Sequence, residues 1–205
     1  MDTLIKKYPD ASCTADVYYL QGDIYREENL FKEAIASYEK VLPFSLQNSS
    51  LLKQSVYGAV GDCYFALASS TDRSEFLNNA VGSYEKLLSF DDVTRENIPM
   101  AHYRLARCHQ LLKQQEKALE NLKVLLYFLP PDEIERHPLS TYWIVKGVNL
   151  AEQLALQNPL PESVKVALQA LDWLERSGIQ NAETIYKRVR KIRKQQQITM
   201  RNMGE

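Results

Sequence analysis

The 205-residue sequence predicts an all-α fold, built from pairs of antiparallel helices without a sheet. Leu, Ala, Glu, Gln and Lys recur at helical spacing, and strict alternation of apolar and polar residues is hard to find. Only seven Gly and eight Pro interrupt this pattern. With 45% hydrophobic and 25% charged residues, the chain is long enough to bury a substantial core. We expect about nine or ten helices between residues 14 and 197.

A pattern of small and aromatic residues recurs along the sequence. Tyr18, Gly22 and Tyr25 are an aromatic residue, a small residue four positions later and a second ring three positions after that. The same spacing begins at Tyr57 and, with histidines as the rings, at His102. Recurrence of this kind indicates internal repeats, each containing a pair of helices.

The second helix of each pair is marked by an Ala-x-x-x-Tyr or Ala-x-x-x-Leu sequence. Its alanine stands twelve residues after Gly22 and Ala106 but nineteen residues after Gly61. We place the seven additional residues, about two helical turns, at residues 68–76. A degenerate fourth copy is centred on Gly147. In every copy we expect the small residue to let the second helix of the same repeat approach closely.

These repeats divide the sequence into six segments of a single domain. They are residues 1–10, the end of a truncated preceding repeat; 14–46, the first repeat; 51–91, the second repeat with its insertion; 97–131, the third repeat; 138–177, a degenerate fourth repeat; and 181–197, a basic capping helix. In the last segment Ile185, Val189 and Ile192 share one face, and Lys and Arg side chains surround it. We therefore expect an amphipathic helix that caps the repeats and presents a solvated basic face.

The repeats resemble the tetratricopeptide repeat family over roughly residues 14–177. Gly22, Tyr25, Ala34 and Tyr38 closely match the pattern W-x-x-L-G-x-x-Y…A-x-x-x-F…P. The resemblance implies a right-handed superhelix of stacked helix hairpins, in which a concave groove holds peptides or helices of other proteins. The small residues are 39, 45 and 41 positions apart, rather than about 34, so we expect an irregular superhelix.

A narrower resemblance concerns the beginning of the chain. The sequence L-I-K-K-Y-P-D followed by Y-Y-L-Q-G-D-I-Y is similar to bacterial tetratricopeptide proteins of the cell envelope and of outer-membrane assembly. That resemblance implies a location in the cytoplasm or on the periplasmic side of a bacterial envelope.

The family's groove positions fall on the first helix of each repeat, beside the small residue. They are Tyr19, Asp23 and Arg26; Asp62, Phe65 and Ser69; and Tyr103, Arg107 and Gln110. Aromatic groups mixed with charged groups are typical of an interaction surface, and the alternative is that these are ordinary solvated helix positions. The family's carboxylate clamp needs Asn where this chain has Asp23 and Asp62, which would repel a terminal carboxylate.

Motifs for catalysis or cofactor binding are absent from the sequence. It contains no phosphate-binding loop, dinucleotide-binding turn, zincin helix or nucleophile elbow, so we predict no catalytic residue, cofactor or metal. The best metal candidates are His102, Cys108 and His109, but both histidines take ring positions of the repeat, which favours core packing. Cys13, Cys63 and Cys108 are predicted to be free thiols.

Charge is distributed unevenly between the tail and the body. Residues 181–205 carry seven Lys/Arg against two Asp/Glu, a balance of +5, so the remainder carries −6. The tail lacks aromatic residues interleaved among its basic clusters and the body is acidic, which disfavours nucleic acid as a partner. The mean hydropathy is −0.37 and no apolar run approaches about 18 residues, so we expect no membrane span.

We therefore expect a non-enzymatic scaffold or adaptor that binds a partner peptide or helix in the groove. The alternative is one domain of a larger regulatory or enzymatic protein whose chemistry lies outside this chain. Self-association stays open, and so does binding of RNA or a membrane surface through residues 181–201, with an affinity that falls steeply with salt.

Overall fold

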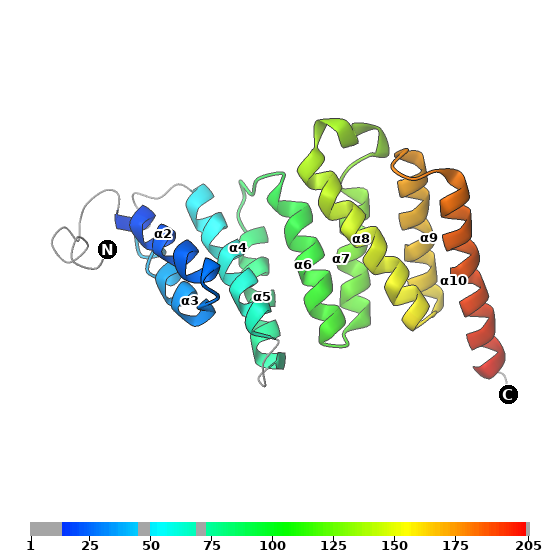
Figure 1. Cartoon of the computed structure of the whole chain (residues 1–205), viewed down its shortest axis with the longest axis horizontal. Coiled ribbons are helices and arrows are strands. Elements are labelled where there is room, and N and C mark those ends of the chain that lie inside the picture. Colours follow the sequence, from blue (N-terminus) through cyan, green and yellow to red (C-terminus); the bar gives the residue numbers. More distant parts are fainter. Residues whose placement is uncertain (1–13, 45–49, 69–72, 204–205) are drawn as a thin grey trace. The chain divides into compact units, whose positions relative to one another are not determined.

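The computed structural model describes residues 14–44, 50–68 and 73–203 (Figure 1). Within these ranges the chain forms nine α-helices and one 3₁₀ helix and no strand, which confirms the predicted all-α class. The helices are α2 (Thr14–Glu27), α3 (Phe31–Glu39), α4 (Ser50–Leu67), α5 (Arg73–Leu88), α6 (Asn97–Leu111), α7 (Gln115–Tyr127), η1 (Pro131–Arg136), α8 (Pro138–Gln157), α9 (Pro161–Arg176) and α10 (Ala182–Met203). The predicted repeat end at residues 1–10 lies outside the described residues, as do residues 69–72 of the predicted insertion.

The chain divides into two compact units, Met1–Asn97 and Ile98–Glu205. In the first unit, α3 packs on α2 and on α4, and α5 packs on α4. In the second unit, α8 packs on α7 and on α9, α7 also packs on α9, and α10 packs on α9 and α8. Helices thus pack on their neighbours in chain order, as expected for stacked hairpins. The single domain and its repeat boundaries stay predictions.

Two hairpin turns have the same backbone conformation. Asn29 between α2 and α3 has a φ of 61°, and Lys113 between α6 and α7 has a φ of 60°. In the first turn the Leu30 N–H donates to the Tyr25 carbonyl oxygen at 2.8 Å, and the α6–α7 turn has an equivalent bond of the same length. A left-handed residue after the helix and a bond reaching back five residues satisfy the last carbonyl groups of the first helix.

Two glycines receive a tyrosine ring from the second helix of their own repeat. A Cβ added to Gly22 would lie 2.5 Å from Cε1 of Tyr38, and one added to Gly61 would lie 2.6 Å from Cε1 of Tyr84. Both tyrosines are fully buried. The predicted close approach of the second helix is therefore confirmed in the first two repeats.

Gly147 behaves differently from the prediction. A Cβ added there would collide with Leu125, which belongs to α7, the second helix of the preceding repeat. The expectation that Gly147 receives its own second helix, α9, is wrong. The reason is that α8 packs against both α7 and α9, and the glycine faces α7.

Candidate functional site

A phenol–carboxylate hydrogen bond joins the first and second helices in each of the first two repeats. The hydroxyl of Tyr38 on α3 donates to Asp23 of α2 at 2.7 Å. In the second repeat, the hydroxyl of Tyr84 on α5 donates to Asp62 of α4 at 2.6 Å. Each carboxylate directly follows the glycine that receives the tyrosine ring. Two of the predicted site residues are therefore fixed in place by a buried side chain.

The proton of Tyr38 is held firmly in this arrangement. Burial of the ring, followed by the hydrogen bond to Asp23, raises the pKa of Tyr38 far above its usual range. Asp23 also accepts a hydrogen bond from Arg26 Nη2 at 2.9 Å, and this pair is partly open to solvent. The carboxylate thus has one buried neutral donor and one cationic neighbour on its own helix.

Tyr19 connects three helices of the first compact unit. Its ring centroid lies 5.4 Å from that of Tyr38 on α3. Burial and then the charge of Asp23 raise the pKa of Tyr19, and the Ser55 side chain on α4 lies near enough to oppose this shift. The side chain is half-buried, so part of it remains at the surface of α2.

The charged site residues of α2 and α4 lie close enough to act on one buried thiol. Burial raises the pKa of Cys63 to about 11, Arg26 opposes this shift, and Asp62 and Asp23 add to it. Cys63 itself is fully buried and is a free thiol, as predicted. The charges of Asp23, Arg26 and Asp62 therefore all influence the Cys63 thiol, and Asp23 contacts Arg26 directly.

The remaining site residues divide between the two compact units. Phe65 is half-buried on α4, and Ser69 lies outside the described residues. On α6 of the second unit, the ring centroid of Tyr103 is 5.5 Å from that of Trp143, and Arg107 donates a hydrogen bond to Gln110. A common groove for all nine residues stays a prediction.

Both histidines of the metal candidate have amide partners. His102 Nδ1 lies 2.9 Å from Asn121 Oδ1, and His109 Nδ1 lies 2.8 Å from Gln114 Oε1. Burial lowers the pKa of His102, while the bond to Asn121 opposes that shift, and His109 is buried. Within the described ranges, no group of three or more His, Cys, Asp or Glu side chains is arranged to hold a metal ion.

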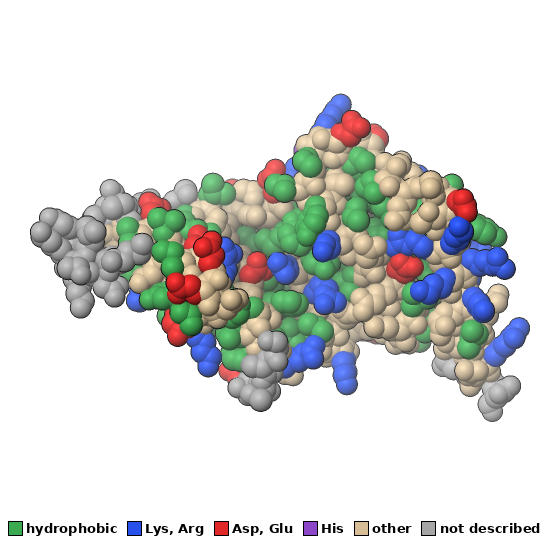
Figure 2. Space-filling view, viewed as in Figure 1, with side chains coloured by type: hydrophobic (Ala, Val, Ile, Leu, Met, Phe, Trp, Pro, Cys, Tyr) green, Lys and Arg blue, Asp and Glu red, His purple; other side chains and the backbone are tan. Residues whose placement is uncertain are grey.

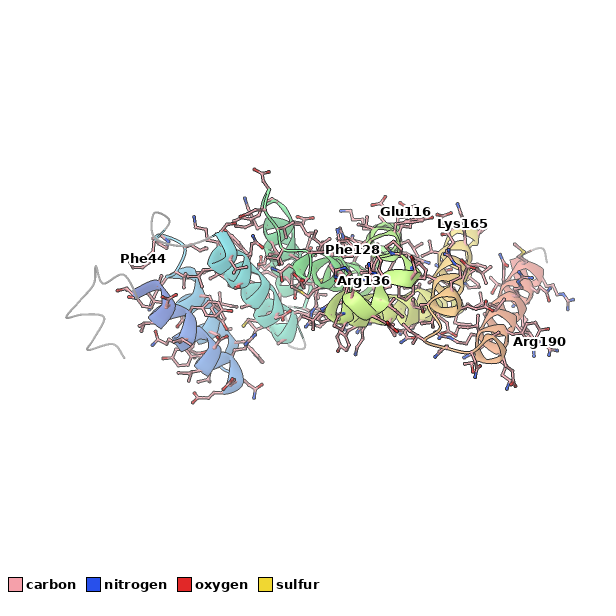
Figure 3. The ribbon with its side chains drawn as sticks, turned by 90° about the horizontal axis from the view of Figure 1, so that it is seen from above. Phe44, Glu116, Phe128, Arg136, Lys165 and Arg190 are labelled. Atoms are coloured by element: carbon pink, nitrogen blue, oxygen red, sulfur yellow. The ribbon has the colours of Figure 1, made fainter. Side chains whose placement is uncertain are left out.

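Three of the surface hollows among the described residues lie in the second unit, and none of these three is lined by a predicted site residue. The largest, about 790 Å³, lies between the α6–α7 turn, α7 and the start of α9, on the side where Figure 3 shows Glu116 and Lys165. An ion pair of Lys123 with Glu162, at 2.5 Å, lies in its wall.

None of the described helices combines the length and the apolar character needed to cross a bilayer.

Two segments of the chain match a known family. Residues 15–42, which contain most of α2 and all of α3, match the tetratricopeptide repeat, and so do residues 100–127, which contain most of α6 and all of α7. The chain carries tetratricopeptide repeats. The resemblance seen in the sequence is thereby confirmed, while the bacterial cell-envelope subtype stays a prediction. Tetratricopeptide repeats are protein-interaction scaffolds in general, and their fold is typically non-enzymatic.

Two solved structures are similar to the chain at low identity. One, from Podosopora anserina, is described as kinesin light chain nearly identical TPR-like repeats; it is 16% identical, with a TM-score of 0.40, and the match covers 94% of this chain and 99% of the other. The second is a variant of that same protein with one substitution, at 15% identity and a TM-score of 0.40, covering 93% and 98%. No curated protein matches the chain.

Proposed function

We propose that the chain is a non-enzymatic scaffold that binds a segment of a partner protein along the first helices of its tetratricopeptide repeats. The observation that carries this proposal is the pair of phenol–carboxylate hydrogen bonds to Asp23 and Asp62. They fix two carboxylates on the first helices of successive repeats before any partner arrives, so little conformational entropy is lost on binding.

The chemistry of this surface favours a basic segment with an apolar side chain. Asp16 and Glu27 are exposed on the same helix as Asp23, and Arg26 is the one cation predicted among the site residues of α2 and α4. The half-buried ring of Phe65 offers an apolar contact on α4. Charge would orient the segment, while the ring would supply most of the affinity.

The proposal is tested with peptides selected on the full chain from a displayed random library. We expect Phe65→Ala to weaken the selected peptides by about 1–3 kcal/mol in calorimetry. Arg107→Glu on α6 should change affinity more at low salt than at high salt, because it reverses a charge. Tyr103→Ala is a poor probe, because its ring packs on Trp143 and its loss would also affect folding.

The matched control is Tyr127→Ala on α7, a second helix. This aromatic side chain is 76% exposed, so its removal tests whether any surface ring contributes. We expect unchanged affinity for Tyr127→Ala, with circular dichroism melts confirming that each variant is folded. Loss of binding in the Tyr127 variant together with full binding in the Phe65 variant would place the contact on the second helices and contradict the proposal.

A further inference from the structure

Charge is segregated along the chain more sharply than the net value of −1 suggests. The first compact unit carries nine Lys/Arg against fifteen Asp/Glu, a balance of −6. Residues 98–180 carry nine of each and are neutral, whereas residues 181–205 carry +5. The positive excess of the second unit therefore resides in the segment that forms α10.

The buried face of α10 leaves most of this positive charge on the outside. Ile185 and Ile192 are buried, and Arg188 is bound to Glu152 of α8. Five further cations are exposed and have no ion pair within the described residues: Arg190, Lys191, Arg193, Lys194 and Arg201. Figure 2 shows blue side chains gathered over α10, and Figure 3 shows Arg190 at the outer side of that helix.

Part of the opposite charge lies on the first described helix and beside its end. Asp16, Glu27 and Glu28 are exposed on α2 and beside its end, where Figure 2 shows red side chains over α2 and α3. Leu20 and Ile24 on the same helix are 54% and 45% exposed. Acidic and apolar side chains thus share the surface of α2.

Length and apolar character match as well as charge. The span from Arg190 to Arg201 is about 17 Å along α10, and the span from Asp16 to Glu27 is also about 17 Å along α2. Tyr186 and Met200 on α10 are 66% and 56% exposed, so this helix also offers apolar contacts beside its charges.

We propose that the basic outer face of α10 docks on the acidic face of α2 in a second copy of this chain. The two faces are different, so the contact is heterologous: each copy offers one acidic and one basic face, and copies add head to tail. The contact shares Asp16 and Glu27 with the peptide-binding proposal but goes beyond it, because its other face is α10 and it uses neither Phe65 nor Arg107. It is expected to weaken as salt rises, since both faces are exposed.

Sedimentation velocity of the full chain over a concentration series tests this contact. In about 50 mM salt, we expect the weight-average sedimentation coefficient to rise with concentration, and in about 500 mM salt the association should weaken at least about tenfold. Arg190→Glu/Lys194→Glu should stay monomeric, and so should Glu27→Lys/Glu28→Lys. A mixture of these two variants should form pairs, because one retains the acidic face and the other retains the basic face.

A control separates position from net charge. Lys113→Glu/Lys117→Glu changes the net charge as much as the α10 variant does, at exposed positions of the α6–α7 hairpin, and should associate like the wild type. A wild-type chain that stays monomeric in low salt would overturn the proposal, and so would a mixture that forms no pairs. A monomeric wild type that binds a 20-nucleotide single-stranded RNA through Arg190 and Lys194 would instead assign α10 to nucleic acid.

Discussion

At the scale of single residues, three glycines in helices have different surroundings. Gly22 and Gly61 pack against the rings of Tyr38 and Tyr84. The ring atoms nearest to an added Cβ include Cδ1 of each tyrosine, which lies close to the point where the ring joins its side chain. Gly82 on α5 has no atom within 4 Å of an added Cβ. The same substitution therefore has opposite consequences at these positions.

We predict that Gly22→Ala and Gly61→Ala each lower the free energy of unfolding by about 1–3 kcal/mol, because the methyl group would force apart two packed helices. Gly82→Ala should raise it by up to about 1 kcal/mol, because alanine is the better helix former and has room. Urea unfolding followed by circular dichroism measures all three. Equal stability of the Gly22 and Gly82 variants would show that the Tyr38 ring can move aside.

The sequence predicts much at this scale, though not the identity of every contact. The spacing of small residues correctly indicated that Gly22 and Gly61 face their second helices, but the same spacing was misleading at Gly147. A small residue shows where a helix can be approached closely, and it does not show which of two neighbouring helices will approach. The bond between Tyr38 and Asp23 was missed, although Gly-Asp followed by Ala-x-x-x-Tyr occurs twice and was the available signal.

Cys63 should make the stability of the chain depend on alkaline pH. Burial raises its pKa to about 11, above the value of about 9 of an exposed thiol, so the folded state favours the neutral form. This contribution is fully present below about pH 9 and is lost as the pH rises towards 11. Urea unfolding at several pH values should show a shallower loss for Cys63→Ala than for wild type. Identical slopes would show that the thiol does not titrate differently in the two states.

At the scale of elements, α10 is held to its unit by one arginine as well as by its apolar face. Arg188 donates to Glu152 Oε2 through Nε at 2.9 Å, to Gln180 at 2.8 Å and to Asn149 at 2.9 Å. Its side chain is only 15% exposed. From the sequence we expect Arg188 to be one of the solvated cations around the helix, and that expectation is wrong for this residue. The sequence pattern cannot distinguish Arg188 from Lys187, because the different exposure of the two side chains is set by Glu152, which α8 places opposite Arg188.

We predict that Arg188→Met lowers the free energy of unfolding by about 3–5 kcal/mol, because it leaves the carboxylate of Glu152 half-buried without its cation. Lys187→Met is the matched control: Lys187 is 71% exposed and pairs with Glu183 at 2.7 Å on the same helix, so about 0.5 kcal/mol or less is expected. Restoration of stability in Arg188→Met/Glu152→Met would confirm that the loss comes from the unpaired acid. Similar losses for both single variants would contradict this account.

At the scale of the whole molecule, the chain has a separate buried cluster in each compact unit. One cluster combines residues of α2, α3 and α4, and the other combines residues from α6 to α10. Both tryptophans, Trp143 and Trp173, belong to the second unit. Tryptophan fluorescence therefore reports on the second unit alone, whereas circular dichroism reports on the helices of both.

This placement of the tryptophans makes the cooperativity of the chain measurable. In stacked repeats, stability is the sum of terms from each repeat and from its contacts with neighbours, so damage in one unit need not unfold the other. We predict that Gly61→Ala lowers the urea midpoint seen by circular dichroism more than the midpoint seen by fluorescence. Gly147→Ala, which crowds Leu125, should instead lower the fluorescence midpoint. Coincident midpoints in both variants would show that the two units unfold as one, in favour of the single domain predicted from the sequence.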